Sequence, residues 1–363
     1  MKNIVRRIKA LFMLIPFIFC LCGCANKTVS GKADVSNLDC LIDLHLHLDG
    51  AISLESAKKL ARLQNIPIPK EDSEIKSLFV VPENCQNLND FLKAFDFPCS
   101  LIQTKEGLTM AVHNLLEELY NQGIIYVEIK FAPQKSTDKG LSQEEAVIAA
   151  IEGLKNSKID ANLILCCMRG DNNHDENMET LRLAKKYLGK GVCALDLAGA
   201  EALYPTENFK DIFSLARKQN IPFTIHAGEA AGPESVNFAL DFGASRIGHG
   251  VRSIEDQKTV ERLARSKIPI DLCPTSNLDT CIFKNISEYP LRKYLDAGVI
   301  VTINTDDPAI ENTSLKKEWQ ILIDEFKITR DELKSLLLNS ANASYASDEI
   351  KLKLIRKINE RLG

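Results

Sequence analysis

Short, nearly continuous apolar runs recur along the chain, and segments with one apolar face separate them. Runs of this kind are typical of parallel strands that are covered on both faces. Eight strands alternating with helices predict an α/β fold consisting of a single (β/α)8 TIM barrel. The eight runs cover residues 40–45, 124–131, 161–168, 192–198, 221–226, 245–248, 268–273 and 299–304.

Amphipathic stretches between these runs predict the helices of an outer ring. An insert at residues 66–100 is longer than a usual connection, and it predicts extra helices that form a flap over the barrel mouth. Its aromatic side chains could equally serve only to pack that flap; they are Phe79, Phe91, Phe95 and Phe97. The predicted ring helices cover residues 108–121, 144–156, 176–187, 209–219 and 256–266, and the closing helices cover 315–326, 331–342 and 348–361.

The first residues form a targeting segment rather than part of the fold. A basic leader precedes an apolar stretch at residues 10–21, which is shorter than the roughly 20 residues of a spanning helix. The stretch ends in Leu21-Cys22-Gly23-Cys24, which resembles the lipobox of bacterial lipoproteins. The resemblance implies a signal peptide at 1–23, a lipid-modified Cys24 and a polar tether at 24–39, followed by one domain at 40–363.

This leader also predicts where the protein is found. A lipid on Cys24 would hold the domain on a membrane of the bacterial cell envelope, facing the periplasm or the exterior. An ordinary signal peptide cut nearby, or an uncleaved anchor, is the alternative. The protein would then be secreted or held differently, and a cytoplasmic location also stays open.

Charge and cysteine content narrow the possible functions. The 363 residues carry a formal charge of −4, and loss of the four cations in residues 1–23 would lower it to −8. So acidic a chain, without a long basic run, is unsuited to binding nucleic acid. The absence of a Cys-x-x-Cys pair argues against a structural zinc knuckle. Free, buried thiols are expected at Cys166, Cys167, Cys193 and Cys273, which lie in apolar runs.

Four potential metal ligands follow or end predicted strands. His45 and His47 are two residues apart, so a strand would place both side chains on one face. His226 ends another apolar run, and Asp306 follows the last one. Three imidazoles and a carboxylate form a ligand set that zinc favours, with a position left open for water. The carboxyl ends of barrel strands are also where active sites lie. We therefore expect one zinc ion per chain.

Two further residues point to catalysis rather than to a structural metal. Glu229 lies three positions after His226, where its carboxyl group could act beside the metal as a proton donor. His249 lies between Gly248 and Gly250, which leave space for a ligand, and its imidazole could accept a proton from water. The alternatives are a helix-capping role for Glu229 and a core position for His249.

Together these segments resemble the adenosine deaminase family of metal-dependent amidohydrolases. The resemblance runs from about residue 40 to residue 351. The segments that carry it are 43–51, 91–96, 126–133, 165–169, 195–199, 226–229, 246–250, 273–277 and 304–308.

The resemblance implies deamination of adenosine and 2′-deoxyadenosine to the inosines, in purine nucleoside salvage, by a protein expected to be a monomer. One zinc would be held by His45, His47, His226 and Asp306. Glu229 would protonate ring nitrogen 1, and His249 would assist the attacking hydroxide. The substrate contacts would be Asp307 with nitrogen 7, the Gly199 amide with nitrogen 3, and Asp49, helped by His47, with the ribose 5′-hydroxyl.

Related functions differ at particular residues. Adenine deaminase-like members usually carry glutamate where this chain has Asp49, and no phosphate-binding cluster favours AMP. The run at 192–198 leads into Gly-Ala-Glu without the lysine of two-metal amidohydrolases. The paired His-x-Glu and Pro-Cys-x-x-Cys signature of the deaminases that edit nucleic-acid bases is missing too, because the chain has no Pro-Cys-x-x-Cys. A deaminase of a related purine, or a catalytically silent nucleoside-binding surface lipoprotein, remains the alternative.

Overall fold

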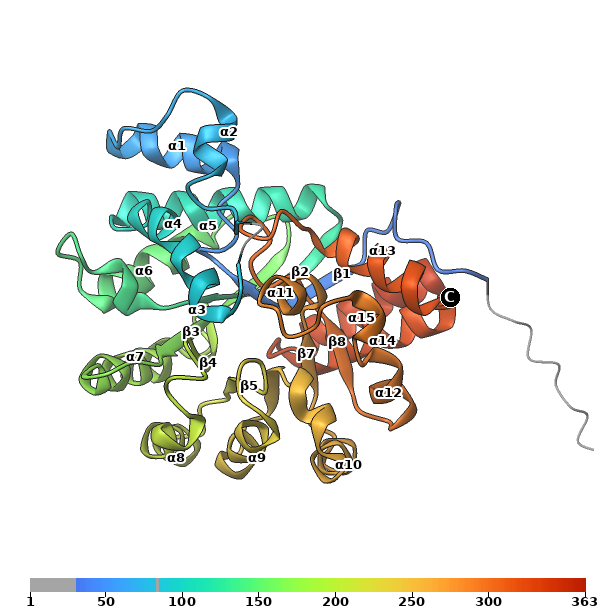
Figure 1. The fold of residues 1–363 in the computed structure, drawn as a ribbon. Coiled ribbons are helices and arrows are strands. Elements are labelled where there is room, and N and C mark those ends of the chain that lie inside the picture. Colours follow the sequence, from blue (N-terminus) through green and yellow to red (C-terminus); the bar gives the residue numbers. More distant parts are fainter. Residues whose placement is uncertain (1–30, 83–84) are drawn as a thin grey trace, which may run out of the picture. The chain divides into compact units, whose positions relative to one another are not determined.

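The computed structural model describes residues 31–82 and 85–363; the predicted signal peptide and Cys24 lie outside these residues. Eight parallel strands form its centre (Figure 1). Strand β1 ends at His47 rather than at residue 45, whereas β5, β7 and β8 are shorter than the apolar runs that predicted them. The strands are β1 Leu41–His47, β2 Ile124–Phe131, β3 Asp160–Met168, β4 Val192–Ala198, β5 Thr224–Ala227, β6 Arg246–His249, β7 Ile270–Leu272 and β8 Val301–Ile303.

The strands pair in sequence order and close on themselves. Two four-stranded ladders, β1-β2-β3-β4 and β5-β6-β7-β8, are joined by a parallel bridge between Leu195 and Phe223. A second parallel bridge, between Leu46 and Asp306, links β1 to the residues after β8. The predicted (β/α)8 barrel is therefore confirmed, and the second bridge brings His45, His47 and Asp306 to the same end of it.

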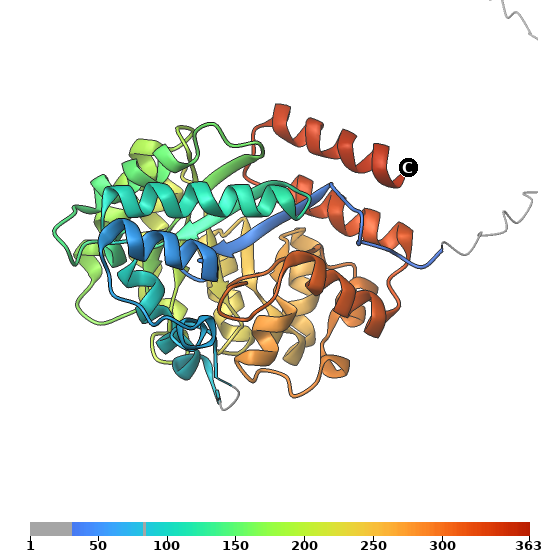
Figure 2. The same cartoon turned by 90° about the horizontal axis from the view of Figure 1, so that it is seen from above.

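Helices surround the strands (Figures 1 and 2), and many of their buried apolar residues belong to the hydrophobic core. Local capping explains where several of them begin: Thr104 accepts a hydrogen bond from the Gly107 amide, and Ser142 forms a capping box with Glu145. The helices after β2 to β6 are α6 Gln143–Gly153, α7 His174–Tyr187, α8 Lys210–Lys218, α9 Pro233–Phe242 and α10 Gln257–Ser266. The others are α1 Leu54–Gln64, α5 Lys105–Asn121, α11 Pro274–Asp279, α12 Leu291–Asp296, α13 Leu315–Phe326, α14 Arg330–Ala343 and α15 Asp348–Leu362.

The predicted flap consists of short helices between α1 and α5. They are α2 Asp72–Lys76, α3 Leu88–Phe91, the 3-10 turn η1 Leu92–Phe95 and α4 Asp96–Ser100. The Phe79 and Phe97 rings stack with their centroids 6.3 Å apart, so these two pack the flap itself. Leu88 and Phe91 form a small apolar cluster with Ile310, which follows β8. The flap is thereby attached to the end of the barrel where the strands terminate.

The segment before β1 packs against the closing helices. The Ala33 amide donates to the Ile328 carbonyl at 3.3 Å, and the Arg330 amide donates to the Gly31 carbonyl at 3.1 Å. Ala33 and Val35 are buried, because their side chains cover apolar surface beside the α13–α14 connection. Within residues 31–82 and 85–363, no helix is both long and apolar enough to cross a membrane.

The thiols predicted to be buried and free are so. Cys166, Cys167, Cys193 and Cys273 are buried, and none of them forms a disulfide with another cysteine of residues 31–82 and 85–363. Burial raises the pKa of the Cys167 thiol far above its usual value. These four cysteines therefore act as small apolar side chains of the barrel.

Candidate metal centre and substrate pocket

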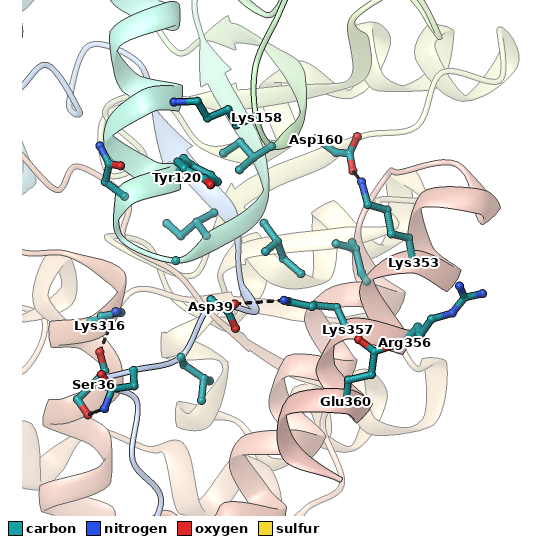
Figure 3. Close-up of a pocket in the computed structure, with 18 residues that line it drawn as sticks. Ser36, Asp39, Tyr120, Lys158, Asp160, Lys316, Lys353, Arg356, Lys357 and Glu360 are labelled. Atoms are coloured by element: carbon teal, nitrogen blue, oxygen red, sulfur yellow. Dashed lines mark hydrogen bonds and ion pairs between the residues drawn. The ribbon is translucent and has the colours of Figure 1, made fainter.

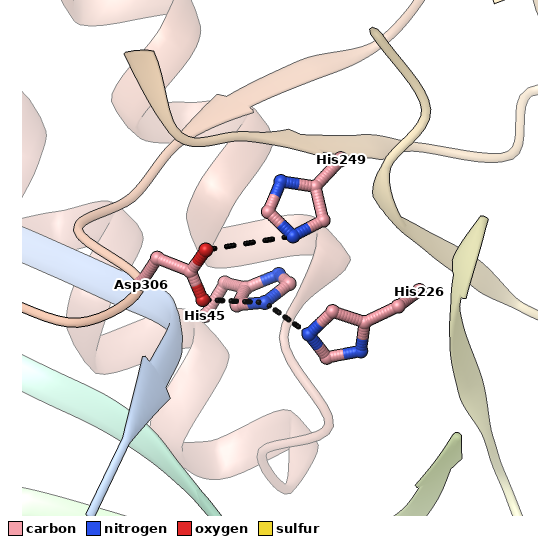
Figure 4. Close-up of side chains that lie close together, drawn as sticks. All are labelled: His45, His226, His249 and Asp306. Carbon is pink, nitrogen blue, oxygen red and sulfur yellow. Dashed lines mark hydrogen bonds and ion pairs between the residues drawn. The ribbon is translucent and has the colours of Figure 1, made fainter. Parts of the chain in front are cut away.

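The four predicted metal ligands converge at the carboxyl ends of β1, β5 and β8. The Nε2 atoms of His45 and His47 lie 2.9 and 3.1 Å from Nε2 of His226. Asp306 Oδ1 lies 3.2 Å from the Nε2 atom of His45 and 3.4 Å from that of His47. Figure 4 shows Asp306, His45 and His226 pointing toward one another. Groups that the sequence separates by up to 261 positions thus surround one point.

The opposite ring nitrogens of two of these histidines face buried carboxylates. His226 Nδ1 lies 2.9 Å from Asp196 Oδ2, which also accepts a hydrogen bond of 2.8 Å from the Lys130 ammonium group. His45 Nδ1 lies 3.8 Å from Asp271 Oδ2. A carboxylate as close as that of Asp196 holds the imidazole orientation of His226 and favours the tautomer whose Nε2 lone pair points at the metal.

These supporting residues were not predicted. Lys130 and Asp196 lie in the segments that carry the family resemblance, and each interrupts an apolar strand with a charge. A charged side chain inside such a run is costly to bury unless it has a partner, so the two charges were the available signal. Which groups they would face depends on strand register, which the local sequence does not contain.

Burial favours the neutral form of His45, His47 and His249, which is the form that binds metals. Burial lowers the pKa of His47 and that of His249 to about 3 each, and it places the pKa of His45 well below its usual value. At neutral pH these imidazoles therefore have lone pairs available. The imidazoles of His45, His47 and His226, together with the Asp306 carboxylate, match the donor set of a tetrahedral metal site. The residues present fit a metal ion.

His249 points to the same place from the end of β6. Its Nε2 atom points toward Asp306 and lies 3.5 Å from Oδ2 of that residue (Figure 4). The same atom lies 3.7 Å from Glu229 Oε2 and has no hydrogen-bond partner among the described residues. Its Nδ1 atom lies 3.2 Å from Nδ2 of Asn277. His249 also belongs, with His45, His226 and Asp306, to a buried group whose possible ligand atoms all lie within 4.8 Å of one another. It is therefore placed either to act on a water molecule beside the metal or to approach the metal itself.

Gly248 explains how His249 and the metal ligands fit together. A Cβ atom on Gly248 would lie 2.9 Å from Cε1 of His45, which is closer than packed atoms allow. The backbone of His249 has a φ of +57°, in the left-handed region, and Gly250 follows with a φ of +66°. The predicted need for space therefore has a specific cause at Gly248, which is the His45 ring, whereas a Cβ atom on Gly250 would lie 3.0 Å from Cγ2 of Ile270.

Glu229 is buried in the loop after β5. Burial, reinforced by the negative charges of Asp306 and Glu201, raises the pKa of Glu229 well above its usual value. The carboxyl group therefore retains a proton under conditions in which an exposed glutamate has lost it. That is the state that a proton donor requires.

A cavity of about 440 Å³ opens in front of these groups. The flap forms one wall through Leu88, Phe91 and Phe95, so the flap covers the barrel mouth as predicted. Among the residues that the structure describes, every predicted site residue except His45 lines this cavity. The lining residues predicted from the sequence are His47, Asp49, Gly199, His226, Glu229, His249, Asp306 and Asp307.

Gly50 has a steric role that the sequence analysis did not assign. A Cβ atom at this position would lie 1.7 Å from Oδ1 of Asp307, so any side chain would displace that carboxyl group. Asp307 Oδ1 is buried without a hydrogen-bond partner. Burial, together with the charges of Asp306 and Asp49, raises the pKa of Asp307 well above its usual value. Asp307 is thus held at the cavity wall with a carboxyl oxygen that is free to form a hydrogen bond.

A larger cavity, of about 780 Å³, lies beside the amino ends of the first three strands (Figure 3). It is lined by Asp39, just before β1, by residues of α15 and by the first residues of β2 and β3. Lys353 pairs with Asp160 there, and Lys357 pairs with Asp39. No histidine lines it, and the catalytic residues of these barrels lie at the carboxyl ends of the strands. The smaller cavity is therefore the active-site candidate.

Known proteins are similar to this chain over most of its length. The adenosine deaminase family profile matches residues 40–361. An adenosine deaminase of Haemophilus ducreyi is 46% identical over 330 residues, which cover 88% of this chain and 96% of that protein. An adenosine deaminase of Enterococcus faecalis is 37% identical over 326 residues, with the same shares covered.

Solved structures agree at the level of the fold. An adenine deaminase from Arthrobacter aurescens superposes with a TM-score of 0.80 at 26% identity, covering 89% of this chain and 98% of that one. A Burkholderia ambifaria amidohydrolase with bound Zn gives a TM-score of 0.81 at 22% identity, covering 92% and 96%. The chain therefore belongs to the adenosine deaminase family of metal-dependent amidohydrolases.

Proposed function

We propose that the protein hydrolyses adenosine to inosine and ammonia, with one zinc ion per chain. The bond between carbon 6 and its amino nitrogen breaks, and a bond from carbon 6 to a water oxygen forms. The observation that carries the proposal is the convergence of His45, His47, His226 and Asp306 at one buried point that Glu229 and His249 also face. The activity of the similar deaminases supports the choice of adenosine.

His45, His47, His226 and Asp306 would hold the zinc. When bound, the ion supplies the Lewis acidity that makes water a nucleophile near neutral pH. The donor chemistry supports zinc, because three imidazoles and one carboxylate leave a coordination position open.

Two side chains move protons in the proposed reaction. Glu229, protonated in the free enzyme, donates to ring nitrogen 1 and makes carbon 6 more electrophilic. His249, whose Nε2 atom is without a hydrogen bond, accepts a proton from the attacking water. Because these two side chains are 3.7 Å apart, Glu229 could reach nitrogen 1 while His249 lies beside the water that attacks the neighbouring carbon 6.

Three further groups would orient the nucleoside. Protonated Asp307 donates to ring nitrogen 7, and the Gly199 amide donates to nitrogen 3. Asp49, helped by His47, accepts a hydrogen bond from the ribose 5′-hydroxyl. None of these contacts involves the 2′-hydroxyl, so 2′-deoxyadenosine should be a substrate as well, in keeping with a role in purine nucleoside salvage.

A substrate panel tests this proposal directly. Purified protein with zinc should release ammonia from adenosine and 2′-deoxyadenosine, and more slowly from adenine, AMP and methylthioadenosine. Fastest turnover of adenine would instead favour the activity named for the Arthrobacter aurescens structure. Binding of adenosine without ammonia release would identify a silent nucleoside-binding protein.

We further propose that Cys24 carries a lipid that holds the protein, as a monomer, on a membrane of the cell envelope. The apolar stretch at 10–21 and the Leu-Cys-Gly-Cys sequence that follows support this location. Cys24→Ser should move the protein from the membrane fraction to the soluble fraction, with Cys22→Ser as the matched control. Unchanged fractionation of Cys24→Ser would contradict the lipid anchor.

A further inference from the structure

A second buried glutamate faces the loop that carries Glu229. Glu201 lies in the connection after β4, and its side chain is completely buried. Its Oε1 atom accepts a hydrogen bond of 2.8 Å from the Gly228 amide. Its Oε2 atom accepts hydrogen bonds from three successive amides, those of Glu229 at 3.0 Å, Ala230 at 2.7 Å and Ala231 at 2.8 Å.

We propose that Glu201 is a positioning residue of the deamination reaction, which places Glu229 by holding the backbone of its loop. The inference rests on the proton-donor role proposed above for Glu229. Glu201 does not line the substrate cavity, so it acts through Glu229 and not on the substrate.

The four amides require an acceptor with this shape and charge. Successive N–H groups that point into one concavity form an anion-binding nest, which a two-oxygen carboxylate can fill. An amide that is withdrawn from water without an acceptor is destabilising, so the loop conformation depends on this carboxylate. The Ser235 hydroxyl donates to the same carboxylate and is itself 2.7 Å from the Thr206 hydroxyl, so the carboxylate is held from the side as well.

Arg169, at the end of β3, fixes the same connection. It donates to the Tyr204 carbonyl at 2.6 Å and to the Thr206 hydroxyl at 2.9 Å. It also donates to the His226 carbonyl at 2.6 Å. Arg169 thus links the connection after β4 to the metal ligand His226, just before the loop that carries Glu229. Glu201 links the same connection to the amides of that loop.

The arrangement has a consequence for the substrate. Gly199, proposed to contact ring nitrogen 3, lies two residues before Glu201 on the same connection. Glu229 would contact nitrogen 1, on the opposite side of carbon 2 in the same ring. Through Glu201, one connection therefore sets the spacing between the groups that face these two nitrogens.

The test compares Glu201→Gln in two backgrounds. In the otherwise unchanged protein, kcat should fall by about 10–100-fold, because misplacing a catalytic group by about 1 Å costs that much. KM should change by less than about threefold, and zinc content should stay at one per chain, because the lost interaction acts in the transition state. In the Glu229→Gln background, the same substitution should lower the residual kcat by less than about twofold.

The controls separate positioning from general damage. Glu207→Gln makes the same change at an exposed residue of the same connection and should leave kcat as it is. Glu201→Asp retains the negative charge but shortens the side chain, so it should also lower kcat. If Glu201→Gln does not fold, Glu201→Asp takes its place in the comparison. Thermal unfolding and zinc content are recorded for every variant.

Two results would overturn the proposal. One is a Glu201→Gln enzyme with the kcat of the unchanged protein. The other is an equal loss of kcat in both backgrounds, which would indicate a role in structure alone. Failure of the proposed function looks different, since the unchanged protein would then release no ammonia from adenosine.

Discussion

Glu229→Gln should retain zinc and a folded barrel yet lose about 10²–10⁴-fold in kcat, which is the range that a positioned proton donor contributes. Glutamine keeps the shape of the side chain but has no acidic proton to give to nitrogen 1. Because Glu229 is outside the proposed ligand set, the loss should appear in kcat rather than in metal content. Steady-state kinetics on adenosine, with zinc measured on the same sample, checks both parts.

Glu234→Gln is the matched control for this variant. It makes the same substitution five residues further on, at an exposed position in the first turn of α9. Its kcat should equal that of the unchanged protein. If Glu229→Gln kept near-normal turnover, another group would have to protonate the ring, and the proposed role of Glu229 would be lost.

A comparison of the unchanged protein with Glu229→Gln also tests whether the pKa of Glu229 is raised. The pKa of Glu229 in the folded protein exceeds the value of about 4.3 that it has in the unfolded chain. At a pH between these two pKa values, the folded state therefore binds more protons than the unfolded state. Stability should therefore fall as the pH rises through this window. Metal-free unchanged protein should lose stability relative to Glu229→Gln over that range, and parallel unfolding curves would show that the carboxyl titrates normally.

The sequence predicted the site residues whose positions follow from the local geometry of a strand or from the end of an apolar run. His45 and His47 share a face because alternate residues of a strand do, and His226 and Asp306 follow apolar runs that end at the barrel mouth. Asp196, Asp271 and Glu201 could not be placed in this way. Each acts through a partner that register or loop path brings near, and no local pattern encodes that distance.

The strand lengths show the same division between local and long-range information. The apolar run at 221–226 predicted a strand over its whole length, but β5 begins only at Thr224. Ile221 and Phe223 are buried all the same, and Phe223 forms only the isolated bridge to Leu195. Apolar character therefore reports burial, whereas the start of a strand depends on where the neighbouring strand offers hydrogen bonds.

His226→Ala should abolish both zinc binding and turnover. Its Nε2 atom lies within 3.1 Å of the Nε2 atoms of His45 and His47, so the substitution removes a donor at the centre of the cluster. We expect kcat/KM to fall by at least about 10⁴-fold, or ~5.5 kcal/mol, because the Lewis acidity that activates water goes with the metal. Metal analysis and adenosine kinetics measure the two losses.

Metal addition separates loss of the ion from loss of the fold in His226→Ala. Zinc added to the chelator-treated, unchanged protein should restore turnover and raise the unfolding temperature, since a ligand that binds only the folded state stabilises it. Neither change should occur in His226→Ala. His174→Ala, which removes an exposed imidazole paired with Asp211 at the surface, should respond to zinc as the unchanged protein does. If His226→Ala retained one zinc per chain and full turnover, the metal centre would have to be built from other residues, and the catalytic scheme would have to be rebuilt around them.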